Sequence, residues 1–251
     1  MLTSSSQLLW EILLLPGGFL AGLVNVLAGG GSFLTLPLLM ATGLPLEMAN
    51  ATNRLSVLLQ GGLATFEYRR KGQLDTGLYK KLLPPILAGA LIGAYLATKL
   101  DPAHLRQVFG AIFLLMAGLL LIRARIKRPE SKPPHALRYP ALFLIGIYGG
   151  FIQAGVGLWI LIGASSLFSV SVLRTNSVKL PLTLTFTVPA LLIFLQADMV
   201  RWFPGMLLAI GTVLGTLVGV RMTLKGGEKV ILRAVLVVLI LTGTHLLFSP
   251  P

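Results

Sequence analysis

GGFLAGLVNVLAGGGSFLTLPLLMATGLPLEMANATNRLSVLLQ, residues 17–60, is the stretch that decides the fold of this chain. It begins as an apolar helix pattern, is interrupted by Gly29, Gly30 and Gly31, and resumes at Ser32 before a polar run at 50–54. At bilayer depth, irregular backbone is tolerated only where protein or a water-filled cavity satisfies its amide groups. A half-helix that restarts at Ser32 would direct its positive end into the gap, so the stretch predicts an anion site at a broken membrane helix.

The composition of the whole chain indicates an integral membrane protein. Of its 251 residues, 55% are hydrophobic and 12% are charged, and the mean hydropathy is +0.86. An ordinary soluble domain has about 25% charged residues. At about 20 to 25 residues for each crossing, the length allows roughly six to nine helical spans and no separate soluble domain.

The net charge of +13 does not indicate a nucleic-acid-binding protein. Lys and Arg occur in short segments between apolar runs, without interleaved aromatic residues, as in cytoplasmic loops that follow the positive-inside rule. The chain has no cysteine, which excludes disulfides and thiolate metal sites, and its three histidines are scattered. We therefore expect no metal site, no cofactor and no nucleic-acid partner.

The first apolar run, residues 8–43, is too long for one crossing. As a single helix it would measure roughly 54 Å, nearly twice the thickness of the hydrocarbon core, so we expect it to break at the three glycines. Runs of about one span follow, and after a basic, proline-containing linker there is a second set of apolar runs. The runs after the first lie at 49–68, 80–99, 105–123, 141–172, 176–195, 203–222 and 230–248.

The two sets of apolar runs resemble each other. AGLVNVLAGGG (21–31) aligns with GGFIQAGVGLW (149–159), and NATNRL (50–55) aligns with TNSVKL (175–180) after a loss of three residues. GALIG (89–93) then aligns with GTVLG (211–215), and both pairs of glycines are expected to let helices pack closely. The shared order indicates an internal repeat, which is typical of secondary transporters. The predicted divisions are a first membrane repeat (1–123), a basic cytoplasmic linker (124–140) and a second membrane repeat (141–251).

The distribution of positive charge favours inverted repeats. If each broken run crossed the membrane once, the 21 Lys and Arg would divide 12 to 9 between the two faces. If each broken run returns to its starting side, 17 lie on one face and only Arg54, Lys99, Arg106 and Arg201 on the other. The second division is the one that the positive-inside rule expects, with both termini outside.

The predicted fold class is therefore an all-α integral membrane protein with two inverted repeats. Each repeat consists of a broken or re-entrant helix pair and three transmembrane helices. A re-entrant hairpin and two short full crossings have the same parity, so eight or ten segments remain possible.

Two cations are central to the predicted site. Arg54 lies near the start of the apolar helix 55–68, and Lys179 precedes the matching helix 180–195. In an inverted repeat they approach a common midplane from opposite sides, where charged residues are costly and usually functional. The alternative is that both extend from helix ends to lipid headgroups. The predicted substrate-binding set is Asn25, Gly29, Gly30, Gly31, Ser32, Thr52, Asn53, Arg54, Gln153, Gly157, Asn176, Ser177 and Lys179.

The uncharged members of this set are hydrogen-bonding side chains and backbone. Such donors suit a sulfonate, although each side chain could equally form an interhelical hydrogen bond without a ligand. The chain has only eight Asp and Glu, none of them in the middle of an apolar run, so a sodium site built from acidic side chains is poorly supported. Proton coupling, passive transport and exchange all remain open, and no catalytic residues are expected.

The motif G-x6-GGG from Gly22, continuing as SFLTLPLL and followed by ANATNRL, resembles the sulfite exporter TauE/SafE family of bacterial membrane proteins. The resemblance covers nearly the whole chain, including both repeats and the linker. This sequence departs from the family pattern in the second repeat. There GVGLW replaces the glycine run, and Val178 and Lys179 stand where the first repeat has Asn53 and Arg54. This departure leaves open whether both halves contribute equally to the site.

The resemblance implies export, or in some members uptake, of small anions such as sulfite and organosulfonates across the bacterial inner membrane by a multi-pass protein. A homodimer is an open alternative to a monomer. Two other classes are weighed against transport. A membrane protein that binds a partner without transporting would show no flux in liposomes. A membrane-embedded lipid phosphatase would need a cluster of intramembrane acids or a Ser/His/Arg constellation, but His104 and His135 are predicted in loops and His245 stands alone in the last helix.

Overall fold

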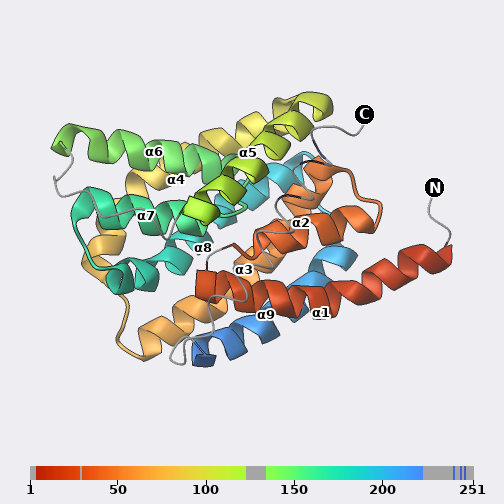
Figure 1. Cartoon of the computed structure of the whole chain (residues 1–251), viewed down its shortest axis with the longest axis horizontal. Helices are drawn as coiled ribbons and strands as arrows, with labels where there is room; N and C mark the ends of the chain where they lie inside the picture. Colours follow the sequence, from red (N-terminus) through yellow and green to blue (C-terminus); the bar gives the residue numbers. More distant parts are fainter. Residues whose placement is uncertain are drawn as a thin grey trace.

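A computed structural model of the chain describes residues 4–28, 30–122 and 134–222, together with residues 240, 244 and 246. These residues are almost entirely helical and form no strand (Figure 1). The helices are α1 (Ser4–Ala28), α2 (Ser32–Ala41), α3 (Leu46–Arg70), α4 (Thr76–Lys99), α5 (Pro102–Ile122), α6 (His135–Phe151), α7 (Val156–Phe168), α8 (Val172–Gln196) and α9 (Trp202–Met222).

The lengths and compositions of the helices confirm the all-α membrane fold class. Four of the described helices contain a stretch long and apolar enough to cross a bilayer: Leu9–Val26, Thr76–Lys99, Arg174–Gln196 and Trp202–Gly219. The two half-helices α2 and α7 have only 10 and 13 residues. Because a crossing needs about 20 residues, neither half-helix spans a membrane by itself.

Both long apolar runs are broken, as predicted. The first break separates the end of α1 at Ala28 from the start of α2 at Ser32, and therefore falls at the three glycines, of which Gly29 lies outside the described residues. The second break separates Phe151 from Val156. Two residues of this second connection, Gln153 and Gly155, have left-handed backbone with φ of 64° and 73°.

The two central helices start earlier than the sequence pattern predicts. α3 begins after Pro45 and α8 after Ser171, whose side chain accepts a hydrogen bond from the backbone N–H of Arg174. The polar runs at 50–54 and 175–179 are therefore helical, and Arg54 and Lys179 lie inside helices rather than at their starts. Buried partners stabilise these runs: the side-chain N–H of Asn50, for example, donates to the carbonyl oxygen of residue 151 at 2.8 Å.

The predicted linker is also shorter on its C-terminal side. α6 begins at His135, so residues 135–140 are helical, with Pro140 in the helix. Proline has no backbone N–H, so at this position α6 lacks the hydrogen bond to the carbonyl oxygen of residue 136. Residues 124–133 of the linker lie outside the described residues.

Glycines let two pairs of helices pack closely side by side. α1 lies along α9, and α4 lies along α6 (Figure 1). A β-carbon at Gly211 or Gly215 of α9 would overlap the carbonyl oxygens of residues 15 and 19 in α1. A β-carbon at Gly89 or Gly93 of α4 would likewise overlap the carbonyl oxygens of residues 143 and 147 in α6. The expected close-packing role of both glycine pairs is therefore confirmed.

The corresponding helices α3 and α8 run antiparallel in the middle of the bundle. Near the start of α3, the guanidinium of Arg54 lies over the ring of Phe194 at the end of α8. Near the end of α3, the hydroxyl of Tyr68 accepts a hydrogen bond of 3.4 Å from Asn176 at the start of α8. Aligned helices that run in opposite directions support the inverted arrangement of the two halves.

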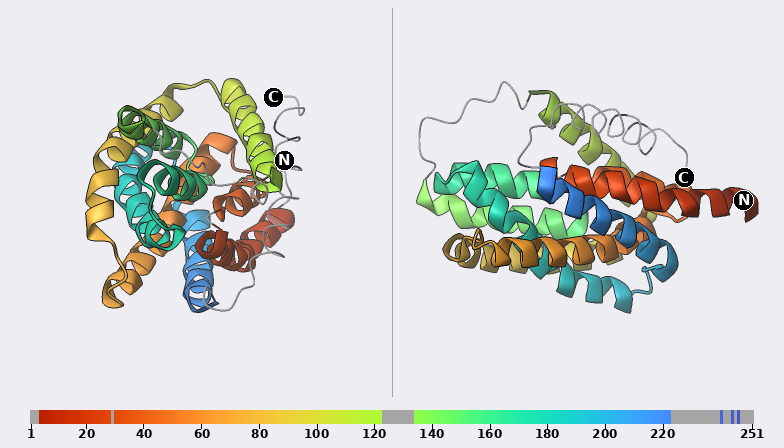
Figure 2. Two further views of the ribbon diagram at one scale, coloured as in Figure 1. Left: turned by 60° about the vertical axis from the view of Figure 1, so that its left-hand side comes forward. Right: turned by 90° about the horizontal axis from the view of Figure 1, so that it is seen from below.

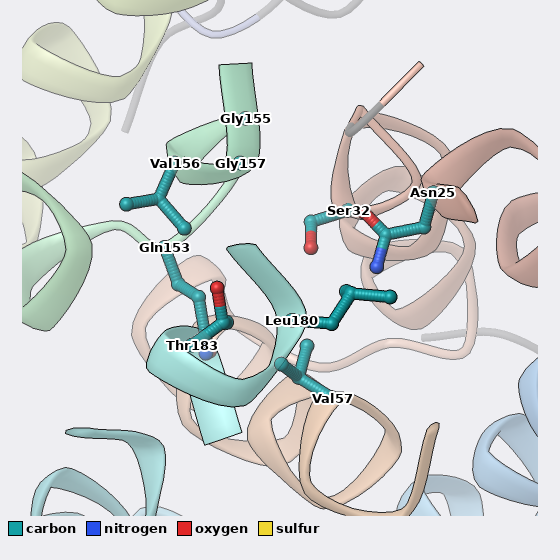
Figure 3. Close-up of a pocket in the computed structure, with 9 residues that line it drawn as sticks. All are labelled: Asn25, Ser32, Val57, Gln153, Gly155, Val156, Gly157, Leu180 and Thr183. Carbon is teal, nitrogen blue, oxygen red and sulfur yellow. The ribbon is translucent and has the colours of Figure 1, made fainter. Parts of the chain in front are cut away.

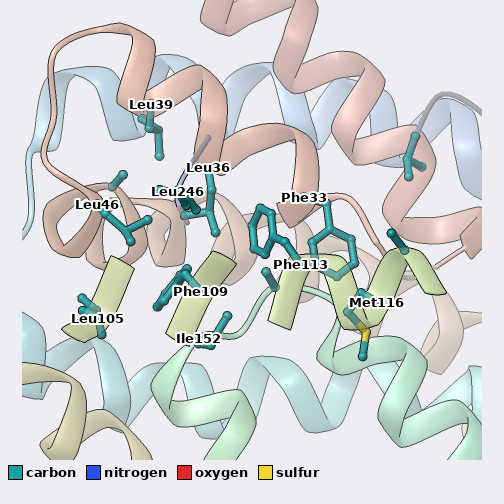
Figure 4. Close-up of a cluster of buried hydrophobic side chains, with 14 of the residues drawn as sticks. Phe33, Leu36, Leu39, Leu46, Leu105, Phe109, Phe113, Met116, Ile152 and Leu246 are labelled. Carbon is teal, nitrogen blue, oxygen red and sulfur yellow. The ribbon is translucent and has the colours of Figure 1, made fainter. Parts of the chain in front are cut away.

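α5 covers the bundle on the side where both helix breaks lie. Phe109 and Phe113 of α5 are fully buried, and the ring of Phe113 contacts that of Phe33 edge to face at 5.3 Å (Figure 4). Leu36 of α2 and Ile152 of the second break join the same apolar cluster. In the right-hand view of Figure 2, α5 lies outside the main body of the bundle, so its inner face seals the helix breaks from the surroundings.

Candidate functional site

A small cavity lies between the two helix breaks, near the middle of α3 and α8. Figure 3 shows residues of the first break on one side of it, residues of the second break on the other, and side chains of α3 and α8 beneath. The lining residues are Asn25, Ser32, Val57, Gln153, Gly155, Val156, Gly157, Leu180 and Thr183. Four predicted site residues, Asn25, Ser32, Gln153 and Gly157, therefore come together around one space.

The N-terminal residues of both half-helices line this cavity. α2 begins at Ser32, and α7 begins at Val156 with Gly155 as its N-cap residue. The first amide groups of a helix have no partner within it, and its N-terminus carries a partial positive charge. Some of these amides are paired within the breaks, such as that of Phe33 with the carbonyl oxygen of Gly30 and that of Val156 with the carbonyl oxygen of Gln153. The partial positive charges of two half-helix N-termini that meet at one cavity still favour an anion there.

The cavity is very small in this conformation. About 10 Å³ is open to the centre of a water-sized sphere, which is room for roughly one water molecule. A sulfite or sulfonate group is larger than this. Side chains or helices must therefore move before such an anion can enter.

Asn25 is held in place by a buried hydrogen bond. Its side-chain N–H donates at 3.0 Å to the side-chain oxygen of Gln60 in α3, which also accepts from the hydroxyl of Thr216 in α9 at 3.4 Å. These contacts fix the orientation of the Asn25 side chain at the cavity. Gln60 and Thr216 thus support the cavity without lining it.

Gln153 combines an unusual backbone with an incompletely paired side chain. Its φ of 64° is uncommon for a residue other than glycine, and strained backbone of this kind is concentrated at functional sites. Its side-chain N–H donates to the hydroxyl of Thr187, whereas its side-chain oxygen is buried without a partner among the described residues. Gln153 therefore brings one unpaired polar atom to the lining of the cavity.

Arg54 is completely buried and contacts the end of α6. Its guanidinium donates to the carbonyl oxygens of Gly149, at 3.5 Å, and Gly150, and its central carbon lies 4.6 Å from the centre of the Phe194 ring. The last carbonyl groups of a helix have no intrahelical partner and carry partial negative charge, so a cation stabilises them. Arg54 thereby fixes the end of α6 immediately before the second helix break.

Arg54 and Lys179 do not line the cavity, but they flank it. Arg54 lies three residues before Val57 in α3, and Lys179 lies four residues before Thr183 in α8, so each cation is one helical turn from a lining residue. Lys179 also directly precedes the lining residue Leu180. Lys179 is 1% exposed, so neither charge reaches the solvent or the headgroups.

Two buried N–H donors on α3 have no acceptor among the described residues. The side-chain oxygen of Asn53 accepts from the hydroxyls of Thr35 at 2.6 Å and Ser56 at 3.1 Å, which leaves its side-chain nitrogen unpaired. The Nε of Arg54 is unpaired as well. Buried donors of this kind are costly unless a ligand or water satisfies them, so they are available to an anion.

The other predicted site residues lie away from the cavity lining. Thr52 accepts a hydrogen bond from the backbone of Arg201, Asn176 donates to Tyr68, and Ser177 donates to the carbonyl oxygen of residue 174. Gly30 and Gly31 complete the first break. A β-carbon at Gly31 would overlap the carbonyl oxygen of residue 21 in α1, so this glycine allows the break to fold tightly.

Sequence reasoning missed five of the lining residues. These are Val57, Gly155, Val156, Leu180 and Thr183. Gly155 aligns with Leu27 in the internal repeat, so the repeat does not identify it. Nothing in the pattern distinguishes the apolar side chains of Val57, Val156 and Leu180 from other residues of membrane helices.

The described residues offer no alternative chemistry at this site. They contain no group of three or more His, Asp or Glu side chains that could hold a metal ion. The buried polar and charged side chains among them include Arg54 and Lys179 but no Asp or Glu. An environment with buried cations and no buried carboxylate favours an anion over a cation.

Comparison with known proteins gives the same class. The family model "Sulfite exporter TauE/SafE" matches residues 14–246. "Probable membrane transporter protein ORF9" of Sinorhizobium sp is 30% identical over 243 residues, covering 94% of this chain and 92% of that protein. "Probable membrane transporter protein YfcA" of Escherichia coli strain K12 is 26% identical over 234 residues, covering 92% and 87%.

A further relative, "Probable membrane transporter protein" of Haemophilus influenzae, is 23% identical over 225 residues and covers 88% of both chains. No solved structure gives a significant match. The family and the relatives indicate a membrane transporter and not an enzyme. The chain belongs to the sulfite exporter TauE/SafE family, and it is a multi-pass membrane protein of the transporter class.

Proposed function

We propose that this protein is a secondary transporter that exports small anions, such as sulfite or organosulfonates, and that the cavity between the two helix breaks is its substrate site. The observation that carries the proposal is that two half-helix N-termini meet at one cavity flanked by the buried cations Arg54 and Lys179. Broken helices that meet near the bilayer midplane are where secondary transporters hold their substrates.

The polar groups around the cavity suit a tetrahedral or pyramidal oxyanion. Asn53 and Arg54 of α3 have buried N–H groups without an acceptor among the described residues, and Ser32 brings a hydroxyl to the lining, whereas the hydroxyl of Thr183 already donates to the carbonyl oxygen of Lys179 at 2.9 Å. Several donors converging on one anion compensate for its lost hydration, and the flanking charges compensate for its burial. The name of the family supports sulfite as one such anion.

The substrate anions can be tested by thermal stabilisation of the purified protein. Sulfite and short sulfonates at about 100 times their dissociation constant should stabilise the folded state by about 2.7 kcal/mol, which raises the melting temperature by several degrees. Sulfate, carboxylates and chloride at equal ionic strength serve as the panel against which this shift is judged. The same anions should accumulate or exchange across liposomes that contain the protein.

Equal shifts of the melting temperature for every anion would argue against this substrate class. Stabilisation without any flux in liposomes would argue against transport. Stabilisation without flux would favour the alternative function, in which the protein binds a partner in the membrane and transports nothing.

The proposed orientation in the bacterial inner membrane has both termini outside and the basic linker in the cytoplasm. The charge division supports it, and so does the contact of Asp75 with Arg174, which places two segments predicted for the cytoplasmic face at the same end of the bundle. We expect a reporter that is active only in the periplasm to be active when fused after Pro251 and inactive when inserted after Glu130. A periplasmic reporter that is inactive after Pro251 would contradict the inverted topology.

A further inference from the structure

The two halves of the molecule meet at each end of the bundle through a matching hydrogen bond. At one end, the backbone N–H of Asp75, in the turn between α3 and α4, donates to the hydroxyl of Ser177 in α8 at 3.4 Å. At the other end, the backbone N–H of Arg201, between α8 and α9, donates to the hydroxyl of Thr52 in α3 at 3.0 Å. Because Thr52 and Ser177 are aligned residues of the two halves, these contacts are equivalent.

The first of these ends also has an ion pair between the halves. The guanidinium of Arg174 contacts one carboxylate oxygen of Asp75 through Nε at 2.7 Å and through a terminal nitrogen at 2.5 Å. At the other end, Arg201 contacts Asp198 of its own loop at 3.7 Å. The two ends of the bundle therefore share the same hydrogen bond between the halves, but the contact is stronger at the end that also has the ion pair.

Asp75 is well placed to keep its charge. Its second carboxylate oxygen accepts from the backbone N–H of Leu78 at 2.9 Å, so it caps α4, and its side chain is 18% exposed. The hydrogen bond from Leu78, followed by those from Arg174, holds the pKa of Asp75 below its ordinary value. The side chain of Arg174 is 60% exposed, so solvent moderates the attraction between the two groups.

We propose that the ion pair of Asp75 and Arg174 is a latch that holds the cytoplasmic end of the transport pathway closed. The inference rests on the proposed function and orientation. α3 and α8 carry Val57, Leu180 and Thr183 of the cavity lining, so opening the cavity toward this end requires the α3–α4 turn to move away from the start of α8. That movement breaks the ion pair between Asp75 and Arg174.

Two further contacts lie at the latched end and would be separated by the same movement. The hydroxyl of Tyr79 in α4 shares a hydrogen bond of 2.6 Å with the hydroxyl of Thr185 in α8, and Tyr68 in α3 accepts one of 3.4 Å from Asn176. Both are hydrogen bonds between neutral groups. The ion pair is the charged contact among them, and charge-assisted hydrogen bonds are roughly twice as strong as neutral ones.

The natural absence of cysteine allows a direct test. A single cysteine introduced as Thr183→Cys would report access to the cavity, since any thiol reaction must occur there. The rate of its modification by a membrane-impermeant thiol reagent is measured in vesicles of each orientation. Asp75→Asn removes the charge but keeps a good helix cap, and Arg174→Gln removes the other partner.

In either latch variant, we expect modification from the cytoplasmic side to become about three- to tenfold faster, with the rate from the outer side unchanged or lower. The double variant Asp75→Asn/Arg174→Gln should be no faster than the faster single variant, because both changes remove one interaction. Arg201→Gln is the matched control, since it removes an ion pair that lies within one loop. It should leave the cytoplasmic rate unchanged.

The possible failures are distinguishable. If both latch variants are modified at the same rate as the parent protein that carries Thr183→Cys, the latch proposal is wrong. The proposed substrate site is then unaffected. If the latch variants accelerate modification equally from both sides, they loosen the bundle as a whole and the latch is also wrong. If no variant is modified from either side, the cavity is not on a transport pathway. This result contradicts both the latch and the proposed function.

Discussion

Replacing Arg54 by glutamine is expected to weaken binding of the anion by about 2 to 4 kcal/mol, the usual scale for the loss of a buried charged partner. This corresponds to a dissociation constant roughly 30- to 1000-fold higher. Two effects contribute. The positive charge one turn from Val57 is lost, and the carbonyl oxygens of Gly149 and Gly150 lose their donor, which loosens the end of α6 before Gln153.

The two effects can be separated by comparing Arg54→Gln with Arg54→Lys. Lysine restores the charge but not the planar group that reaches two carbonyl oxygens, so it should recover part of the affinity and less of the stability. Anion affinity is measured by calorimetry, and the melting temperature is measured without anion. Lys132→Gln in the basic linker is the control for removal of one positive charge.

Anion binding by Arg54→Gln as tight as that of the Lys132→Gln control would show that Arg54 supports only the packing of α6. A loss of affinity together with an unchanged melting temperature would assign Arg54 mainly to the substrate. Either result distinguishes the charge of Arg54 from its contacts with the backbone.

Replacing Gly155 by alanine is expected to reduce transport at least about tenfold, because this residue shapes the second helix break at the cavity. Its φ of 73° costs an alanine about 1 to 2 kcal/mol. A β-carbon at this position would also overlap the ring of Phe33, with the ring carbon Cε2 only 2.7 Å away. Relieving the overlap must displace the ring of Phe33, which is fully buried against Phe113, or the N-terminus of α7, which lines the cavity.

Gly62→Ala is the matched control for this change. Gly62 lies in α3 with no atom within 4 Å of its added β-carbon, and alanine in a helix is favoured over glycine by about 1 kcal/mol. We therefore expect Gly62→Ala to insert, purify and transport like the parent protein. Adding Phe33→Leu to Gly155→Ala should restore part of the flux by removing the overlap, although the backbone strain remains.

Flux is measured in liposomes at equal protein content, after the folded fraction of each variant has been determined by size-exclusion chromatography. Normal flux in Gly155→Ala would mean that the second break is only a connection between helices. It would also remove the strongest geometric reason for placing the substrate between the two half-helices.

The sequence by itself determined the membrane class, the order of the helices and the position of the first break. Hydrophobic composition and run length dictate helices in a bilayer, because unsatisfied backbone groups are too costly there. The three glycines predicted the first break for the same reason. The glycine pairs at 89 and 93 and at 211 and 215 predicted close helix packing, since close approach of two helices requires small residues along one face.

The starts of α3 and α8 were beyond the reach of the sequence pattern. Asn50, Thr52 and Asn53 have modest helix propensity, and in isolation they favour caps and turns. They are helical here because their polar groups find partners on other elements, such as the carbonyl oxygen of residue 151 for Asn50 and the hydroxyl of Thr35 for Asn53. Tertiary contacts thus outweighed local preference.

Tertiary structure alone decided which polar residues share one space. The pattern predicted that Arg54 and Lys179 approach a common midplane, but it could not show that the guanidinium of Arg54 caps α6 while Gln153 and Ser32 line the cavity. These contacts join residues about 95 to 120 positions apart in the chain. Their geometry depends on how two separately patterned halves pack together, and hydrophobic periodicity within one segment carries no information about that packing.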